Sequence, residues 1–217
     1  MHYQLIVFDW DGTLYDSSHF IVSCVQEAAR RAEVMIPPTH VVRQMIGLSF
    51  DEALKRAIPD LSSEKTAKLR AIYRQCVMEA DTIKPALFPK AKQTVQALFD
   101  AGYWLAIATG KGRAGLNADL TSLDLQSFFL TTRCAEETQS KPHPQMLFEI
   151  MDELGVPSEK TLMVGDTEYD VQLAKNAGVD AVAATYGVHK KEHLDAFDVK
   201  HFIDDIEELF PWVSNQK

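Results

Sequence analysis

Cysteine and long apolar runs are scarce in this chain, and each scarcity removes a class of protein. Three cysteines, Cys24, Cys76 and Cys134, occur among 217 residues. Their odd number and wide spacing fit neither a disulfide framework nor a zinc site, so we expect free thiols that are buried or half-buried. No apolar run approaches the ~18–20 residues that span a membrane. The N-terminus enters an apolar strand pattern without a charged and apolar leader, which predicts a cytoplasmic protein.

Positive charge is also in short supply. The chain has 22 Lys and Arg against 31 Asp and Glu, a net charge of −9, and no basic run. This balance argues against nucleic acid or an anionic membrane as a partner. A small anionic substrate remains compatible, because a metal ion and a few local cations could hold it. The length suits one large domain or a core with a small insert, and no feature predicts the oligomeric state.

The most informative segment that is present lies near the N-terminus. The apolar run 6–8 predicts a buried parallel strand, and Asp9 and Asp11 follow at its carboxyl end, where open α/β sheets bind ligands. If the chain stays extended, both carboxylates point to the same side, and Mg²⁺ is their natural partner. One acid could attack a phosphoryl group and the other could exchange protons. Gly12 permits a tight turn, and the Thr13 hydroxyl can orient a carboxylate. The alternative is an Asp-Gly turn with solvated acids.

The next segment, residues 15–84, reads as helical throughout. Predicted helices run from Asp16 or Ser17 to about Glu33, over 41–46, over 51–57, and onward from Ser62 or Ser63. This insert divides an α/β core into residues 1–14 and 85–217. It suggests a lid or cap over the strand ends, with hinges near 15–16 and 83–87. The alternative is a helical subdomain that only adds core.

From Pro85 onward, helix and strand patterns alternate. The expected helices are 90–100, 112–122, 144–154, 168–177 and 204–210, and the expected strands are 104–108, 128–131, 161–164, 181–185 and 201–203. Repeated strand–helix units predict a parallel sheet with right-handed crossovers.

Polar residues follow several of these strands. Thr109 and Gly110 come before a helix start, where a hydroxyl and backbone amides suit a phosphate. Lys141, held before a proline, could neutralise a nucleophilic carboxylate and a phosphate oxygen. Asp166 ends a buried strand, and Asp170 follows at the i, i+4 spacing that puts both on one helix face. An ordinary strand–helix turn and a solvated capping pair are the plainer alternatives.

Together these motifs resemble those of the haloacid dehalogenase-like superfamily of phosphotransferases. Asp9-Trp10-Asp11-Gly12-Thr13 looks like its first motif and Thr109 like its second. Lys141 with Pro142 looks like the third, and Gly165-Asp166-Thr167 with Asp170 like the fourth. Within the superfamily the chain is most similar to the phosphoglycolate phosphatase-like group, on the basis of Asp16-Ser17, residues 108–111 and residues 141–144.

The resemblance implies a role for each matching residue. Asp9 would be the nucleophile and a Mg²⁺ ligand, and Asp11 the general acid and base with its backbone carbonyl on the metal. Asp166 would complete the protein ligands. The remaining matches would act as supports: Thr13 and Asp170 for the metal site, and Thr109, the Gly110 amide and Lys141 for the phosphoryl oxygens.

The resemblance also implies a fold and a reaction. The fold is a Rossmann-like three-layer α/β sandwich with strand order 3-2-1-4-5 and an inserted all-helical cap. The reaction is magnesium-dependent hydrolysis of a small phosphomonoester, phosphoglycolate-like or a sugar phosphate, through an aspartyl-phosphate. Asp11 favours phosphate esters over dehalogenation or phosphonate cleavage. A phosphomutase of the β-phosphoglucomutase type is the alternative, whereas a receiver-like signalling module is about half this length and lacks the insert.

Overall fold

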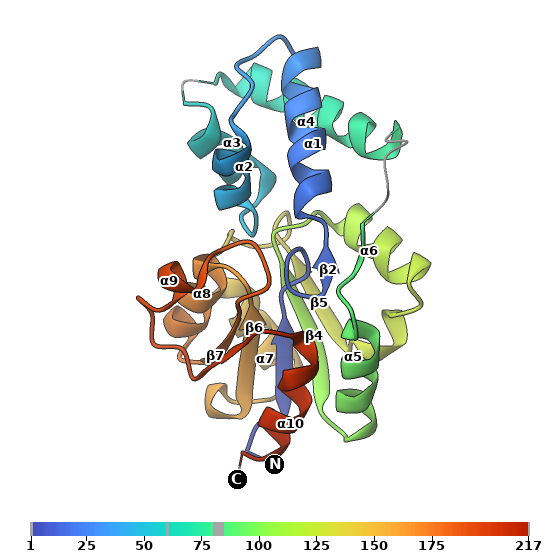
Figure 1. The fold of residues 1–217 in the computed structure, drawn as a ribbon, viewed down its shortest axis with the longest axis vertical. Helices are drawn as coiled ribbons and strands as arrows, with labels where there is room; N and C mark the ends of the chain where they lie inside the picture. Colours follow the sequence, from blue (N-terminus) through green and yellow to red (C-terminus); the bar gives the residue numbers. More distant parts are fainter. Residues whose placement is uncertain (1, 60, 80–84, 217) are drawn as a thin grey trace.

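The computed structural model describes residues 2–59, 61–79 and 85–216. Its centre is a six-stranded parallel sheet in the order β5-β4-β1-β6-β7-β8 (Figure 1). The strands are β1 (Leu5–Phe8), β4 (Trp104–Thr109), β5 (Thr131–Cys134), β6 (Thr161–Gly165), β7 (Asp180–Ala184) and β8 (His201–Ile203). The predicted class is confirmed. The predicted order 3-2-1-4-5 is incomplete, because the last strand pairs with β7 and extends the sheet.

Both faces of the sheet are buried, which explains the continuous apolar strands. Ile6 and Phe8 of β1 share one apolar cluster with the helices α5 (Ala91–Asp100), α6 (Arg113–Ser122) and α10 (Leu209–Ser214). Leu5 and Val7 share the other cluster with α7 (Gln145–Leu154), α8 (Glu168–Ala177) and α9 (Lys191–Leu194). Alternate residues of one strand thus hold the two helical layers of the sandwich.

The strand predicted over 128–131 is wrong by several residues. Residues Gln126–Phe128 form a 3-10 turn, and β5 begins at Thr131. Phe128, at the end of this turn, and Phe129, directly after it, pack on the core. The true strand reads as polar because it lies at the sheet edge, where Arg133 reaches outward to Glu149 and Glu153.

The C-terminal helix also differs from its prediction over 204–210. A 3-10 turn occupies Ile206–Glu208, and α10 continues to Ser214. Pro211 sits in the first turn of α10, where its missing N–H costs no helical hydrogen bond. The short helix α9 and the 3-10 turn Ser158–Lys160 were not predicted.

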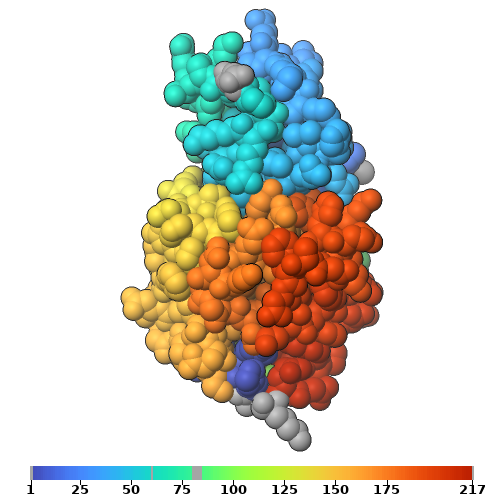
Figure 2. All heavy atoms as spheres, turned by 90° about the vertical axis from the view of Figure 1, so that its left-hand side faces the viewer, coloured from blue at the N-terminus to red at the C-terminus, as the bar shows by residue number. Residues whose placement is uncertain are grey.

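The four helices predicted in the insert are present. They are α1 (Ser18–Arg31), α2 (Thr39–Met45), α3 (Phe50–Ala57) and α4 (Ser63–Glu79), here called the helical block. The block has an apolar cluster of its own, which includes Ala28, Leu54 and Leu69. It lies over one end of the α/β core (Figures 1 and 2).

A two-stranded antiparallel ribbon joins the two connections between block and core. Strand β2 (Tyr15–Asp16) pairs with β3 (Ala86–Leu87) in a region predicted to be helical or hinge-like. Such short strands carry no readable alternation, so the pattern could not reveal them. The domain boundary at residue 14 stays a prediction, and the other, near residue 84, lies outside the described residues.

Two smaller expectations concern the cysteines and the membrane. All three cysteines are free and buried, as predicted. Among the described residues, no helix is both long and apolar enough to cross a bilayer.

Candidate active site

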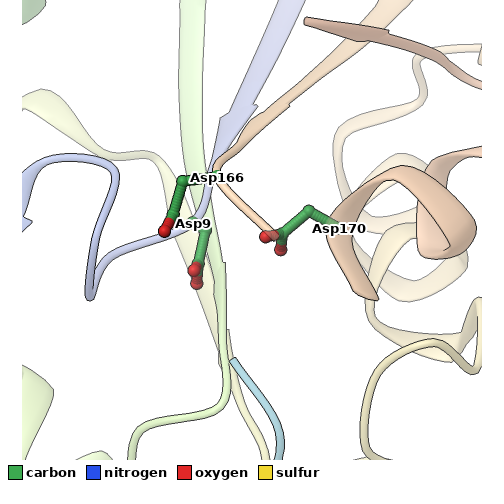
Figure 3. Close-up of side chains that lie close together, drawn as sticks. All are labelled: Asp9, Asp166 and Asp170. Atoms are coloured by element: carbon green, nitrogen blue, oxygen red, sulfur yellow. The ribbon is translucent and has the colours of Figure 1, made fainter. Parts of the chain in front are cut away.

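Three neighbouring strands deliver polar side chains to one edge of the sheet. Asp9 follows β1, Thr109 ends β4, and Asp166 follows β6. Because β1 lies between β4 and β6, the three residues meet above the carboxyl ends of the strands. Figure 3 shows the side chains of Asp9 and Asp166 side by side, with the carboxylate of Asp170 directed toward them from α8. One oxygen from each lies within 4.8 Å of the others.

Lys141 supplies the positive charge of this cluster. Its ammonium lies 2.7 Å from Asp9 Oδ1 and 2.6 Å from Asp170 Oδ1, and all three side chains are buried. Three ionised carboxylates around one ammonium would leave two excess negative charges in a place closed to water. Uncompensated buried charge is costly, so the cluster calls for a cation.

The excess negative charge and the burial raise the pKa values of two of these carboxyl groups. Burial, opposed by Lys141 and reinforced by Asp170 and Asp166, raises the pKa of Asp9 well above its ordinary value. Burial and the Asp170 carboxylate raise the pKa of Asp166 to about 7. Asp9 Oδ2 is moreover buried without a hydrogen-bond partner among the described residues. An orphaned carboxylate oxygen beside two further carboxylates fits an oxygen-liganded divalent ion such as Mg²⁺.

Asp166 is held in place by backbone and side-chain donors. Thr13 Oγ1 donates to its Oδ1 at 2.8 Å, and the Val188 amide donates to its Oδ2 at 2.7 Å. Gly12, at φ +97°, lies so close that an added Cβ would come within 2.3 Å of Asp166 Oδ2. The first acidic motif therefore also positions the last one.

Asp170 reaches the cluster by a route that the sequence interpretation missed. Asp166 precedes α8, so the two acids do not share a helix face, and the i, i+4 argument is wrong. Instead Asp170 is the third residue of α8 and forms a capping box with Thr167. Its Oδ2 accepts from the Thr167 amide at 3.0 Å and hydroxyl at 2.7 Å, while Oδ1 accepts from Lys141. Both of its oxygens thus already have partners.

The carboxylate of Asp11 lies outside this group of three. Ser17 Oγ donates to Asp11 Oδ1 at 2.6 Å, and Lys111 Nζ lies 3.1 Å from the same oxygen. The expectation that both early acids share one cation through their side chains is therefore not met. Asp9 and Asp11 nevertheless line the same cavity.

Lys111 and its partners are an addition to the predicted site. Lys111 Nζ bridges Asp11 and, at 3.2 Å, Asp119, whose Oδ2 accepts from Trp10 Nε1 at 3.0 Å. Burial lowers and the two carboxylates raise the pKa of Lys111, and the net direction is upward. Lys111 belongs to residues 108–111, on which the resemblance partly rests, but no role was predicted for it, and no spacing in the sequence links it to Asp119.

Thr109 and Gly110 complete the floor of the cavity. Thr109 is buried, and its Oγ1 accepts from the Lys111 amide at 3.1 Å. Gly110 faces the loop between α2 and α3, where an added Cβ would lie 2.4 Å from Leu48 O. Core and helical block therefore touch directly at the cavity, which measures about 140 Å³.

Comparison with known proteins agrees with this arrangement. The model of the family described as haloacid dehalogenase-like hydrolase matches residues 6–184. A protein named "Probable phosphatase IndB" from Dickeya dadantii (strain 3937) is 34% identical over 212 residues, covering 94% of this chain and 91% of the relative. A phosphoglycolate phosphatase from Vibrio vulnificus (strain YJ016) is 28% identical, covering 95% and 94%. The crystal structure of a hydrolase from Pseudomonas syringae matches with a TM-score of 0.88 at 21% identity, over 98% of each chain.

The chain belongs to the haloacid dehalogenase-like hydrolase family. The resemblance read from the motifs, including the phosphoglycolate phosphatase-like group, is thereby confirmed, and so is the expectation of an enzyme of the hydrolase class. The roles of the individual residues stay predictions.

Proposed function

We propose that this hydrolase is a magnesium-dependent phosphatase of small phosphomonoesters that works through an aspartyl-phosphate. The observation that carries the proposal is the buried cluster of Asp9, Asp166 and Asp170 around Lys141, with the unpartnered Asp9 Oδ2 beside the cavity. The names of the relatives, phosphatase and phosphoglycolate phosphatase, support the same class of reaction.

The Asp9 carboxylate is the proposed nucleophile. Lys141 fixes its Oδ1 and leaves Oδ2 for a bound cation or substrate. A carboxylate oxygen attacks phosphorus, the bond from phosphorus to the alcohol oxygen breaks, and an aspartyl-phosphate forms. Thr109 and Gly110 line the cavity, and Lys141 lies 2.7 Å from Asp9 Oδ1. These three groups are the proposed partners of the phosphoryl oxygens.

Asp11 is the proposed general acid and base. It gives its proton to the leaving alcohol oxygen and then takes one from the water that attacks the aspartyl-phosphate. That second attack breaks the bond between phosphorus and the Asp9 oxygen, which releases phosphate and restores Asp9. Ser17 and Lys111 hold the Asp11 side chain in one orientation.

Asp9, Asp166 and the Asp11 backbone carbonyl are the proposed Mg²⁺ ligands. Asp170 supports them through Lys141 and Thr167, since both of its oxygens are already engaged. Bound Mg²⁺ would offset the charge of the carboxylates and of the phosphoryl oxygens. The helical block acts in this proposal as a cap that excludes bulk water from the cavity.

A phosphomutase is not favoured. A mutase must hold a second phosphate on the far side of the cavity. Lys111 is the one cation among the described cavity residues, and it is already paired with two carboxylates. We further propose a cytoplasmic location, supported by three buried free thiols, which are typical of a reducing compartment.

The test is phosphate release from a panel of small phosphomonoesters by the wild type, Asp9→Asn and the exposed control Asp152→Asn. We expect release with Mg²⁺ and none with excess chelator, loss of at least about 10³-fold in Asp9→Asn, and near-normal rates in the control. Mg²⁺ should also raise the melting temperature of the wild type, because it binds the folded state alone. Retention of more than a few per cent of activity in Asp9→Asn would contradict the nucleophile assignment.

A further inference from the structure

The wall of the cavity opposite Asp9 is almost wholly apolar. Each helix of the helical block contributes to it: Val25 from α1, Val42 from α2, Leu54 and Ala57 from α3, and Tyr73 from α4. The ring of Tyr73 packs against Phe50 with centroids 4.6 Å apart, which adds an aromatic surface to the wall. An alcohol group that extends from phosphorus away from Asp9 meets this surface.

The same wall offers no charge to an anionic alcohol group. Among the described residues that line the cavity, the only cation is Lys111, which is paired with Asp11 and Asp119. Arg56 and Arg70, both in the helical block, are paired with Glu52 and Asp51. A carboxylate or second phosphate in this half of the cavity would lose its water without gaining a partner, which is strongly unfavourable.

The size of the cavity limits the alcohol further. A volume of about 140 Å³ is close to that of an apolar engineered cavity that binds benzene. The phosphoryl group takes part of this space at the polar end. A sugar would also bring several hydroxyl groups against a wall in which the Tyr73 hydroxyl is the one polar side-chain group among the described residues.

We propose that the substrates are phosphomonoesters of small, uncharged and mainly apolar alcohols, and that the helical block disfavours esters whose alcohol carries a carboxylate or a second phosphate. The inference rests on the proposed phosphatase function. It separates this chain from its phosphoglycolate phosphatase relatives by the alcohol that the cavity accepts. The phosphate chemistry at the carboxyl ends of the strands stays the same.

The experiment compares kcat/KM for benzyl phosphate, n-propyl phosphate and 2-phosphoglycolate, with acetyl phosphate as a substrate that needs few contacts to the apolar wall. Benzyl phosphate and n-propyl phosphate are suitable comparisons for 2-phosphoglycolate, because the leaving group of each of the three esters is a weakly acidic alcohol. We expect benzyl and n-propyl phosphate to exceed 2-phosphoglycolate by at least about tenfold. Equal or better turnover of 2-phosphoglycolate overturns the inference.

Acetyl phosphate separates the two proposals. The wild type could hydrolyse acetyl phosphate and also turn over 2-phosphoglycolate at least as well as benzyl and n-propyl phosphate. In that case the phosphatase function stands and the inference about the alcohol fails. If it hydrolyses none of the four compounds, the proposed function itself fails, and the inference fails with it.

A pair of methionine variants tests whether the wall sets the preference. Met45 lines the cavity and is half-buried, so Met45→Lys adds an ammonium that an anionic alcohol could reach. Met78 on α4 is 78% exposed, and Met78→Lys is the matched control. We expect Met45→Lys to lower the ratio of benzyl phosphate to 2-phosphoglycolate turnover by about tenfold, with no change in Met78→Lys. An unchanged ratio in a folded Met45→Lys overturns the inference.

Should Met45→Lys fail to fold by circular dichroism, Phe50→Ala provides a second arm. It removes one ring of the aromatic pair with Tyr73 and should lower kcat/KM for benzyl phosphate about tenfold more than for 2-phosphoglycolate. An equal loss for both esters would show that the wall does not select the alcohol.

Discussion

The two walls of the cavity are built from opposite chemistry. On the sheet side, buried carboxylates and an ammonium stand at the ends of apolar strands, held by short hydrogen bonds. On the side of the helical block, the described lining side chains are aliphatic or aromatic, and the Tyr73 hydroxyl is their one polar group. The polar wall tolerates little change, because Lys141 is the partner of two of its buried carboxylates and the loss of either partner leaves a buried charge unpaired. The apolar wall can change residue by residue without unbalancing charge, and such a wall is suited to setting substrate choice.

The largest effect on activity and stability is expected when the ammonium of Lys141 is removed from the polar wall. In Lys141→Met, the buried Asp9 and Asp170 carboxylates lose their common partner. We expect activity to fall by at least about 10³-fold and the free energy of unfolding to fall by about 3–5 kcal/mol. Urea denaturation and phosphate release measure the two effects, with the exposed Lys175→Met as control. Near-normal activity would contradict the role described for Lys141 in this cluster.

The contact between the walls can be broken at Gly110. In Gly110→Ala the new Cβ would meet the Leu48 and Gly47 carbonyl oxygens at 2.4 and 2.6 Å, so the helical block must move away. A displacement of about 1 Å costs roughly 10²-fold in rate, and we expect a loss of this size in kcat/KM with little change in melting temperature. In Gly112→Ala the Cβ meets only the flexible end of Glu136 at 3.2 Å, so a much smaller loss is expected. Equal losses in both variants would count against the contact.

Lys111 lies between the carboxylates of Asp11 and Asp119 and forms an ion pair with each. In Lys111→Met, Asp11 and Asp119 lose the ammonium between them, and Asp11 keeps only its hydrogen bond from Ser17. We expect kcat to fall about tenfold to 10²-fold, with partial recovery in Lys111→Arg. The exposed Lys68→Met serves as control. An unchanged kcat would remove Lys111 from the site.

The smallest predicted effect concerns pH and the seam between the two regions. His189 Nε2 lies 3.2 Å from the Gln44 carbonyl of the helical block, and its Nδ1 accepts from the Glu168 amide. Burial lowers the pKa of His189, so the fold holds the neutral ring while the unfolded chain protonates near 6.5. This contribution to stability is present above about pH 6.5 and lost as the pH falls below it.

Melting temperatures at pH 5.5 and 7.5 test this expectation. A contribution of about 1 kcal/mol corresponds to roughly 2–4 °C for a chain of this size. The wild type should therefore lose about that much more on acidification than His189→Gln. The exposed His143→Gln should behave like the wild type, and identical pH responses in all three proteins would contradict the assignment.

Sequence patterns predicted more of the sheet wall than of the opposite wall. Asp9, Thr109 and Asp166 could be placed together because each follows an apolar run, and parallel strands end at a common edge. Strand β5 was misplaced because an edge strand needs no apolar run. The ribbon of β2 and β3 was not predicted because a strand of two residues shows no periodicity. Asp170 was placed at the site for the wrong reason, since a capping box rather than a helix face directs it inward.

By itself the sequence determined the order of the longer strands and helices, the four-helix insert and the acids at the strand ends, because local periodicity and turn residues encode them. Only the tertiary structure decided the pairing of Lys111 with Asp11 and Asp119, the unpartnered Oδ2 of Asp9 and the apolar wall of the cavity. Each of these joins segments far apart in the chain. Their distances depend on how the helical block packs over the sheet, and no spacing along the sequence records that packing.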